Sequence, residues 1–251
     1  MAGAWNARQQ QIVDRLQTDG EIRLHDLKSA FSVTEMTIRR DLEKLEQAGL
    51  LRRTFGGAIL ADRDVALKDR VSVMTEEKIS IGRMAAALIQ SGDYVFIDGG
   101  STTYELARAL KPGLDITVVT NALNVAGVLQ DKGIPAIVSG GMILEATSTL
   151  IGPFAEQLVG SMAYTRIFLG TTGVSAQHGF SNSNMYETQI KRAAIRQTSE
   201  VNILADHTKF GAKELLSFAR LSEANRLITD ASPDHQLLSA CKEADMEVTV
   251  A

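Results

Sequence analysis

Apolar residues recur at helical spacing in three short segments near the start of the chain. The first segment has its apolar stripe at Ile12, Val13 and Leu16, and Asn6 can cap this helix together with Gln9 in a reciprocal arrangement. The stripe of the second segment consists of Leu24, Leu27 and Phe31. This pattern predicts two consecutive short helices.

A third helix is expected after a two-residue turn. Thr34 is its predicted N-cap, and Val33 and Ile38 have the spacing of a hydrophobic staple. The helix should end near Gly49, after which a Gly-Gly pair separates two strand-like runs within residues 50–60. This order of elements predicts a helix-turn-helix module followed by a β-hairpin wing.

Short apolar runs alternate with helical segments beyond a charged, weakly periodic stretch at 61–76, which we interpret as a linker. The predicted strands are Tyr94–Ile97, Ile116–Val119, Ala136–Val138, Arg166–Leu169, Val201–Leu204, Arg226–Thr229 and Glu247–Val250. The helical candidates between them are Thr102–Leu110, Asn121–Gln130, Phe154–Val159, Asn184–Thr198 and Pro233–Glu243. Such alternation predicts a mainly parallel sheet covered by helices on both faces. The fold class is therefore α/β, with expected domains at 1–60 and 77–251.

Composition narrows the classes of protein that fit. The chain has 251 residues, of which 45% are hydrophobic and 22% charged, as in ordinary globular proteins. Its single cysteine, Cys241, excludes an intramolecular disulfide and a cysteine-built zinc site, and the four histidines lack metal-ligand spacing. No apolar run is long enough to span a bilayer, and the N-terminus lacks the pattern of a secretory signal. We expect no metal, no cofactor, no membrane association and a cytoplasmic location.

The net charge of -4 by itself argues against a nucleic-acid partner, because duplex phosphate favours basic surfaces. The acidic excess belongs to the second part of the chain, however. Residues 1–60 hold nine Lys and Arg against eight Asp and Glu, which leaves 17 against 22 for the remainder. DNA affinity must then depend on a few well-placed basic side chains and on the pairing of two modules, so we expect a homodimer or homotetramer.

The third helix presents polar side chains opposite its apolar stripe of Ile38, Leu42 and Leu45. Arginine can bond guanine edges, threonine and methionine can contact a thymine methyl group, and lysine suits phosphate. The candidate DNA-contacting residues are Thr34, Met36, Thr37, Arg39, Arg40, Lys44, Arg52 and Arg53. Two alternatives remain: a solvated helix face on which Asp41 and Glu43 balance the arginines, or a module for dimerisation or partner binding.

The run Asp98-Gly99-Gly100-Ser101-Thr102-Thr103 connects a predicted strand to a predicted helix. Glycines allow close backbone approach, and a helix start offers free N–H groups and a positive dipole end, which suits phosphate. The run is neither a P-loop nor a dinucleotide fingerprint, and a capped helix start without a ligand is the alternative. Other candidates at the expected carboxyl edge of the sheet are Thr120-Asn121, Gly140-Gly141, Gly170 to Gly173 and Asp206 to Gly211, and Glu187 and Lys191 lie one helical turn apart.

These motifs together resemble the DeoR family of bacterial transcriptional regulators. In the first module the resemblance rests on Thr34 to Leu42, Leu45, Gly49 to Arg53 and Gly56 to Ala58. In the larger part it rests on the loop after Asp98, Val118 to Asn121, Gly140-Gly141, Gly152, Gly170 with Gly173, Lys191 and Asp206 to Gly211. One departure is Phe55, where the family often has a histidine.

The resemblance runs from about Arg8 to Asp230 and implies a sensor domain similar to ribose-5-phosphate isomerase with a phosphorylated sugar as effector. By position, the phosphate would be held by Gly100, Ser101, Thr102 and Thr103. The other effector-binding positions would be Asp98, Gly99, Thr120, Asn121, Gly140, Gly141, Gly170, Glu187, Lys191, Asp206 and Lys209.

The expected function is that of a DNA-binding regulator, a repressor of a carbohydrate operon, and not of an enzyme. The alternative is a sugar-phosphate isomerase that carries a DNA-binding appendage. Such an enzyme needs a carboxylate base and a lysine that stabilises an enediolate, which Asp98, Glu187, Asp206 and Lys191 could supply.

Overall fold

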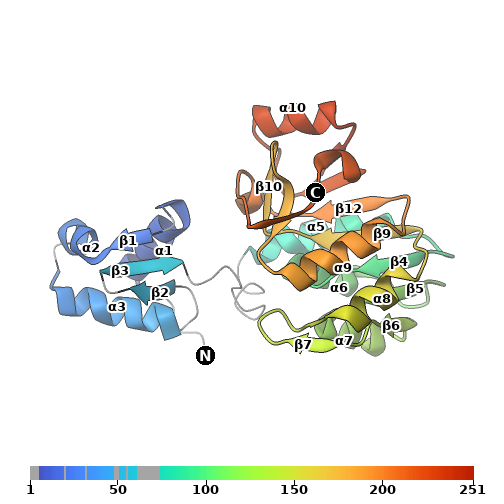
Figure 1. The fold of residues 1–251 in the computed structure, drawn as a ribbon, viewed down its shortest axis with the longest axis horizontal. Coiled ribbons are helices and arrows are strands. Elements are labelled where there is room, and N and C mark those ends of the chain that lie inside the picture. Colours follow the sequence, from blue (N-terminus) through green and yellow to red (C-terminus); the bar gives the residue numbers. More distant parts are fainter. Residues whose placement is uncertain (1–5, 20, 32, 48–50, 55, 61–73) are drawn as a thin grey trace. The chain divides into compact units, whose positions relative to one another are not determined.

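The structure is a computed structural model of the chain, and it describes residues 6–19, 21–31, 33–47, 51–54, 56–60 and 74–251. The chain divides into two compact units, Met1–Asp69 and Arg70–Ala251 (Figure 1). Among the described residues, one hydrophobic core lies in the smaller unit and two lie in the larger unit. Within the described ranges, no helix combines the length and the apolar character needed to cross a membrane.

In its described residues, the smaller unit contains three helices and a three-stranded sheet. The helices are α1 (Ala7–Asp19), α2 (Leu24–Phe31) and α3 (Glu35–Gln47). The strands are β1 (Glu21–Arg23), β2 (Leu51–Thr54) and β3 (Gly57–Leu60), in the order β1-β3-β2. The three helices and the β2–β3 hairpin predicted from the sequence are confirmed.

The predicted helix caps are also present. The backbone N–H of Gln9 donates to Asn6 Oδ1 at 2.9 Å, and the backbone N–H of Asn6 donates to Gln9 Oε1 at 3.1 Å. At the start of α3, the backbone N–H of Thr37 donates to the Thr34 hydroxyl at 3.3 Å. Both helices therefore begin where short polar side chains satisfy amides that have no partner within the helix.

Strand β1 is an element that the sequence pattern did not reveal. Three residues are too few to show an alternating pattern, and the strand is recognised only by its pairing with β3. Ile22 lies opposite Ala58 of β3, and both side chains are buried in the core of the smaller unit. The wing is thereby tied to the helices through a third strand.

The larger unit is built on a seven-stranded sheet in which every neighbouring pair is parallel. Its order is β15-β14-β12-β9-β4-β5-β6. The strands are β4 (Tyr94–Ile97), β5 (Thr117–Thr120), β6 (Ala136–Val138), β9 (Arg166–Gly170), β12 (Val201–Leu204), β14 (Arg226–Thr229) and β15 (Glu247–Val250). All seven strands predicted from the sequence belong to this sheet, within a residue at their ends.

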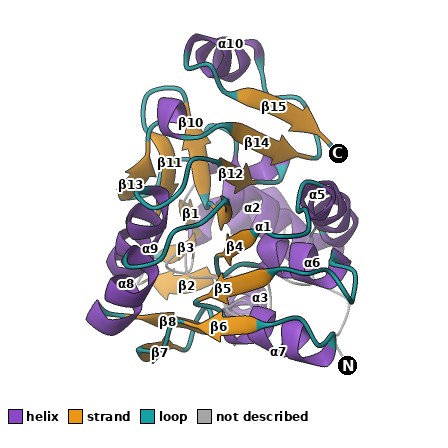
Figure 2. Cartoon of the chain, turned by 90° about the vertical axis from the view of Figure 1, so that its right-hand side faces the viewer, coloured by secondary structure: helices purple, strands orange, loops and turns teal. Residues whose placement is uncertain are grey.

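Helices cover both faces of the sheet (Figure 2). Val95 and Ile97 pack in one core with α5 (Thr75–Ala87), α6 (Ser101–Ala109) and α7 (Leu123–Asp131). Phe96, which points the other way, packs in the second core with α8 (Pro153–Gly160), α9 (Met185–Ile195) and α10 (His235–Glu243). The predicted α/β fold class is confirmed.

Helix α5 corrects the predicted linker. The helix begins at Thr75, inside the stretch 61–76 that we interpreted as a linker, and residues 61–73 lie outside the described residues. Its contact with α6 requires small residues: a Cβ on Gly82 would lie 2.6 Å from the carbonyl carbon of Glu105. A helix that packs through glycine and alanine shows a weak apolar stripe, which is why the pattern did not predict it.

Several short elements outside the main sheet were also not predicted. These are β7 (Met142–Leu144) with β8 (Thr149–Ile151), β10 (Gly173–Ser175) with β11 (Gly179–Asn182) and β13 (Leu216–Ala219), and the 3-10 turns η1 (His207–Lys209) and η2 (Leu221–Glu223). Strands β10, β11 and β13 contain glycine or serine where the main-sheet strands have continuous apolar runs, so no such run marks them in the sequence.

Candidate functional site

Helix α3 presents one buried and one exposed face. Ile38, Leu42 and Leu45 are at most 1% exposed, whereas Met36 is 62% exposed. Arg40 is exposed as well, on the same side as Met36. The helix therefore offers a basic, partly apolar outer surface while its other side anchors it to the module.

Two of the candidate arginines already have acidic partners. Arg39 bonds Glu35 one turn earlier at 2.7 Å, and Arg53 of β2 bonds Glu46 with its Nε at 2.5 Å and its backbone N–H at 2.8 Å. The backbone N–H and then the guanidinium of Arg53 hold the pKa of Glu46 below its usual value. In the part of the chain that is described, Arg40 has no such ion pair.

Other candidates for DNA contact lie around these residues. Thr34 and Thr37 share a hydrogen bond between their hydroxyls at 2.9 Å, and Lys44 is exposed on α3. Arg52 belongs to β2, although its side chain is outside the described part, and Phe55 is itself outside the described residues.

Asp41 belongs to the buried side of α3, which contradicts the alternative in which it is a charge on a solvated helix face. It is 4% exposed and accepts hydrogen bonds from Arg8 Nε at 2.6 Å and from Gln9 Nε2 at 2.8 Å. These bonds fasten α3 to the start of α1. The available sequence signal was its position three residues after Ile38, next to the apolar stripe.

The candidate effector site lies where the order of the sheet reverses. From β4 the chain proceeds to β5 and β6 on one side, and later through β9, β12, β14 and β15 on the other. The segments that leave β4 and β9 therefore diverge at the carboxyl edge, which is where open parallel sheets bind ligands. Asp98 directly follows β4, and Gly170 ends β9.

A buried ion pair connects these two strand ends. Lys191 of α9 forms an ion pair with Asp98, and its ammonium also donates to the Gly170 carbonyl at 2.7 Å. Asp98 Oδ2 accepts the backbone N–H of Gly170 at 3.2 Å, and the ring of Phe218 lies 5.2 Å from the ammonium. Both charged side chains are only about 2% exposed, so water does not solvate them. Each charge therefore depends on the opposite charge for its stabilisation.

The start of helix α6 leaves hydrogen-bond donors available. The first amide that is bonded to the preceding turn is that of Tyr104, which donates to Gly100 at 3.0 Å. The amides of Ser101, Thr102 and Thr103 have no acceptor within the described residues, nor do the hydroxyls of Ser101 and Thr102. Together with the helix dipole, these donors make an environment that favours an anion.

Thr149 is a member of this region that the sequence did not indicate. A Cβ on Gly99 would lie 2.1 Å from Thr149 Cγ2, so the loop depends on glycine at that position. The Thr149 hydroxyl donates to Glu187 Oε1 at 3.0 Å and lies 2.7 Å from the Thr147 hydroxyl. No strand-end motif marks Thr149, which reaches the site only through the β7–β8 hairpin.

Thr120 and Asn121 are buried at the end of β5. The Thr120 hydroxyl donates to the Ile97 carbonyl at 2.7 Å and accepts the backbone N–H of Ala122 at 3.1 Å, so it joins the ends of β4 and β5. Asn121 is 0% exposed, and its Oδ1 atom has no hydrogen-bond partner in the described structure. An unpaired buried acceptor is uncommon and fits a site that binds a polar ligand.

Four further candidates lie on the same edge, and none of them forms a hydrogen bond or an ion pair with Asp98 or Lys191 in the described structure. Asp206 is buried and caps η1 through the backbone N–H of Thr208 at 3.1 Å, and Lys209 ends that turn. Gly140 and Gly141 follow β6, and Gly141 has a φ of 108°, a conformation that favours glycine. In the structure, Gly140 and Gly141 form part of the turn that leads into β7.

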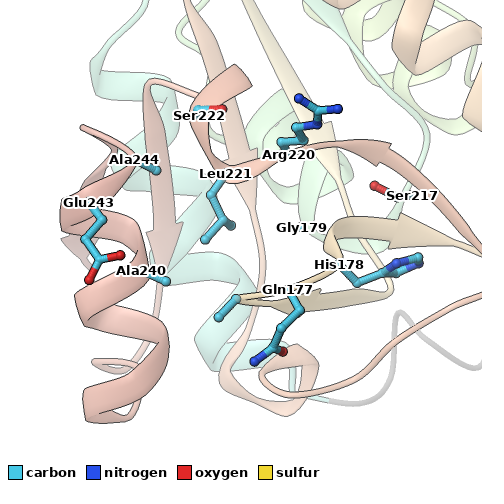
Figure 3. Close-up of a pocket in the computed structure, with 11 residues that line it drawn as sticks. Gln177, His178, Gly179, Ser217, Arg220, Leu221, Ser222, Ala240, Glu243 and Ala244 are labelled. Carbon is cyan, nitrogen blue, oxygen red and sulfur yellow. The ribbon is translucent and has the colours of Figure 1, made fainter.

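A cavity of about 540 Å³ lies elsewhere in the larger unit (Figure 3). Gln177 and His178 of the β10–β11 hairpin border it on one side and Glu243 of α10 on the other. None of the candidate effector residues lines it. In the described residues, no three His, Cys, Asp or Glu side chains gather as a metal site.

Comparisons with known proteins cover almost the whole chain. Residues 8–64 match the family model for the DeoR-like helix-turn-helix domain, and residues 73–231 match that for the DeoR C terminal sensor domain. The uncharacterized regulator YulB of Bacillus subtilis (strain 168) is 34% identical over 246 residues, 96% of this chain and 95% of that protein. The repressor GlcR of the same organism is 34% identical over 243 residues, 95% of this chain and 93% of that protein.

A third relative is the glycerol-3-phosphate regulon repressor of Escherichia coli (strain K12), which is 32% identical over 225 residues, 88% of this chain and 89% of that protein. Among solved structures, ribose 5-phosphate isomerase A of Methanocaldococcus jannaschii is similar over 54% of each chain, with 16% identity and a TM-score of 0.40. The three relatives are regulators of transcription, which decides against the alternative of an enzyme with a DNA-binding appendage. The chain belongs to the DeoR family of transcriptional regulators.

Proposed function

We propose that this protein is a cytoplasmic repressor of a carbohydrate operon and that a phosphorylated sugar controls its binding to the operator. The observation that carries the proposal is the helix start at Ser101, whose free amides lie at the reversal point of the sheet next to the Asp98–Lys191 pair. The name of one relative, a glycerol-3-phosphate regulon repressor, supports the choice of regulated genes, and the name of the repressor GlcR supports repression.

The arrangement suits both parts of a phosphorylated sugar. The amides and hydroxyls of Ser101 and Thr102 would bind the phosphate group. The carboxylates of Asp98 and Glu187 and the unpaired Asn121 Oδ1 can accept hydrogen bonds from sugar hydroxyls. A ligand that bonds these groups more strongly in one conformation than in another would shift the population of DNA-binding states, with a coupling of about 1–3 kcal/mol.

In this proposal, α3 makes the contacts that recognise the operator. Arg40 and Met36 would contact base edges in the major groove, and Lys44 would contact a phosphate. A module of nearly zero net charge binds DNA weakly by itself, so two modules in a dimer would read paired half-sites about one helical turn apart.

The effector assignment is tested by thermal-shift screening of the full-length protein against a panel of sugar phosphates. We expect one of them to raise the melting temperature and to change the affinity for the operator. Ser101→Ala should weaken that ligand, whereas Ser239→Ala, a matched change on α10, should not. If no sugar phosphate alters either melting or operator binding, the sensing role is wrong.

The DNA assignment is tested by binding to the promoter next to the protein's own gene. Arg40→Ala should cost about 1–3 kcal/mol of specific binding and relax the sequence preference at one base pair. Lys28→Ala, an exposed change on α2, serves as the control. An Arg40→Ala variant with unchanged affinity and preference would contradict the role of Arg40.

A further inference from the structure

The two edges of the seven-stranded sheet differ in their chemistry. At one edge, Glu247 of β15 is exposed and pairs with Arg226 of β14 at 2.8 Å. At the opposite edge, all residues of β6 are exposed, and residues 133–144 around it contain no charged side chain. Edge strands that face water are usually protected by charges, because their free N–H and C=O groups can pair with another strand. The β6 edge lacks that protection.

Large apolar side chains gather around the β6 edge. On β6 itself, Ile137 and Val138 are each 39% exposed. On the neighbouring elements β7, α8 and α9 the exposed fractions are 60% for Met142, 63% for Ile143, 78% for Phe154, 53% for Met185 and 38% for Tyr186. We call these seven residues the edge surface. They account for most of the large, strongly exposed apolar side chains of the described larger unit.

The parts of the edge surface adjoin one another. Met142 pairs with Ile151 across the β7–β8 hairpin, and its Cε atom lies 3.8 Å from the position of a Cβ on Gly152, two residues before Phe154. The same hairpin reaches the start of α9 through the hydrogen bond from Thr149 to Glu187, next to Met185 and Tyr186. The chain therefore links β6, β7, α8 and α9 at one end of the unit.

The exposed area is of the size that a dimer needs. If each fully exposed side chain of this size offers roughly 150–250 Å², the exposed fractions of the seven side chains amount to roughly 550–900 Å². A standard interface buries about 800 Å² on each partner, whereas the largest apolar patch of an ordinary monomer covers about 300–600 Å². The edge surface is at the upper end of what a monomer exposes and in the range of a subunit interface.

We propose that the edge surface binds the edge surface of a second copy of this chain, so that two β6 strands meet across a two-fold axis. A two-fold axis perpendicular to the strands brings identical strands together in antiparallel orientation, which pairs their free backbone groups and buries the apolar side chains of both copies. The inference rests on the proposed function in one respect, because it assigns a surface to the proposed dimer.

The experiment measures the mass of the full-length protein by sedimentation velocity at micromolar concentrations. The wild type should be a dimer or a multiple of one. Ile143→Glu and Val138→Lys should each weaken the dimer by at least about tenfold, because each places like charges opposite each other across the axis. Val250→Glu on β15 is the matched control, an exposed apolar residue at the opposite edge of the sheet, and should keep the wild-type mass.

A second measurement does not depend on how these variants fold. Ile137→Cys introduces a thiol near the proposed axis, and the native cysteine, Cys241, is 0% exposed and should not react. A short bis-maleimide should then link two copies through the new thiol, whereas Val250→Cys should give no linked dimer.

Three outcomes are distinguishable. A monomeric wild type would overturn both the proposed dimer and this interface. A dimeric wild type in which Ile143→Glu and Val138→Lys keep the full mass, or in which Ile137→Cys does not crosslink, would overturn the edge surface alone. Failure of the sugar-phosphate screen or of the Arg40→Ala test would leave these masses unchanged, so it would contradict the proposed function and not this interface.

Discussion

Replacing Lys191 with methionine removes the ammonium group from the ion pair with Asp98 while it keeps most of the side-chain volume. Lys191 is 2% exposed, and its ammonium contacts the Asp98 carboxylate, the Gly170 carbonyl at 2.7 Å and the face of the Phe218 ring. After the replacement, the buried carboxylate keeps the Gly170 N–H at 3.2 Å as its described donor. The variant therefore leaves a buried charge without its counter-ion.

The size of the effect follows from the burial of the pair. Breaking a buried ion pair by removal of one partner costs about 3–5 kcal/mol. For a unit of this length, 1 kcal/mol shifts the melting temperature by about 2–4 °C, so Lys191→Met should lower the melting temperature of the larger unit by roughly 6–20 °C. The assay is differential scanning calorimetry of the full-length protein.

The double variant Asp98→Asn/Lys191→Met distinguishes a charge effect from a packing effect. It removes both charges, keeps an acceptor for the Gly170 N–H, and should be more stable than Lys191→Met alone, because a buried pair can often be replaced by neutral groups at little cost. Glu247→Gln, which disrupts an exposed ion pair with Arg226, is the control and should cost at most about 1 kcal/mol. If Lys191→Met melts like the wild type, or if the double variant is destabilised by the sum of the single changes, the reasoning is refuted.

Three further changes test other contacts. Gly99→Ala should destabilise the larger unit by about 1–3 kcal/mol, since its Cβ would lie 2.1 Å from Thr149 Cγ2, and Thr149→Ser should restore part of the loss in chemical denaturation. Asp41→Asn should destabilise the smaller unit by about 1–3 kcal/mol, measured by its thermal melting in circular dichroism, because it weakens one buried and one partly buried hydrogen bond. The hydrogen bond to Asp230 raises the pKa of His207, so its contribution to stability should be complete below pH ~6.5 and lost as pH rises through the raised pKa. The melting temperature of His207→Gln should therefore approach that of the wild type as pH rises, and a gap that widens instead would contradict this.

The sequence by itself determined the elements whose pattern is local. The helices of the smaller unit follow from apolar spacing, and their starts follow from Asn6 and Thr34, whose side chains bond amides three residues away. The central strands of the main sheet could be predicted because strands covered by helices on both faces are rich in apolar residues, and the edge strands β6 and β15 because they continue the alternation with helices. The loop from Asp98 to Thr103 could be found for the same reason, since a strand end, two glycines and a helix start are contiguous.

Only the tertiary structure decided what depends on contacts between distant residues. Asp98 and Lys191 are 93 positions apart, and they meet because the strand order reverses between β4 and β9. Thr149 reaches the same region through a hairpin of three-residue strands, and the burial of Asp41 depends on how α3 packs against α1. A period in the sequence reports which face of one element is apolar, whereas partners, strand order and exposed edges are properties of how the elements pack together.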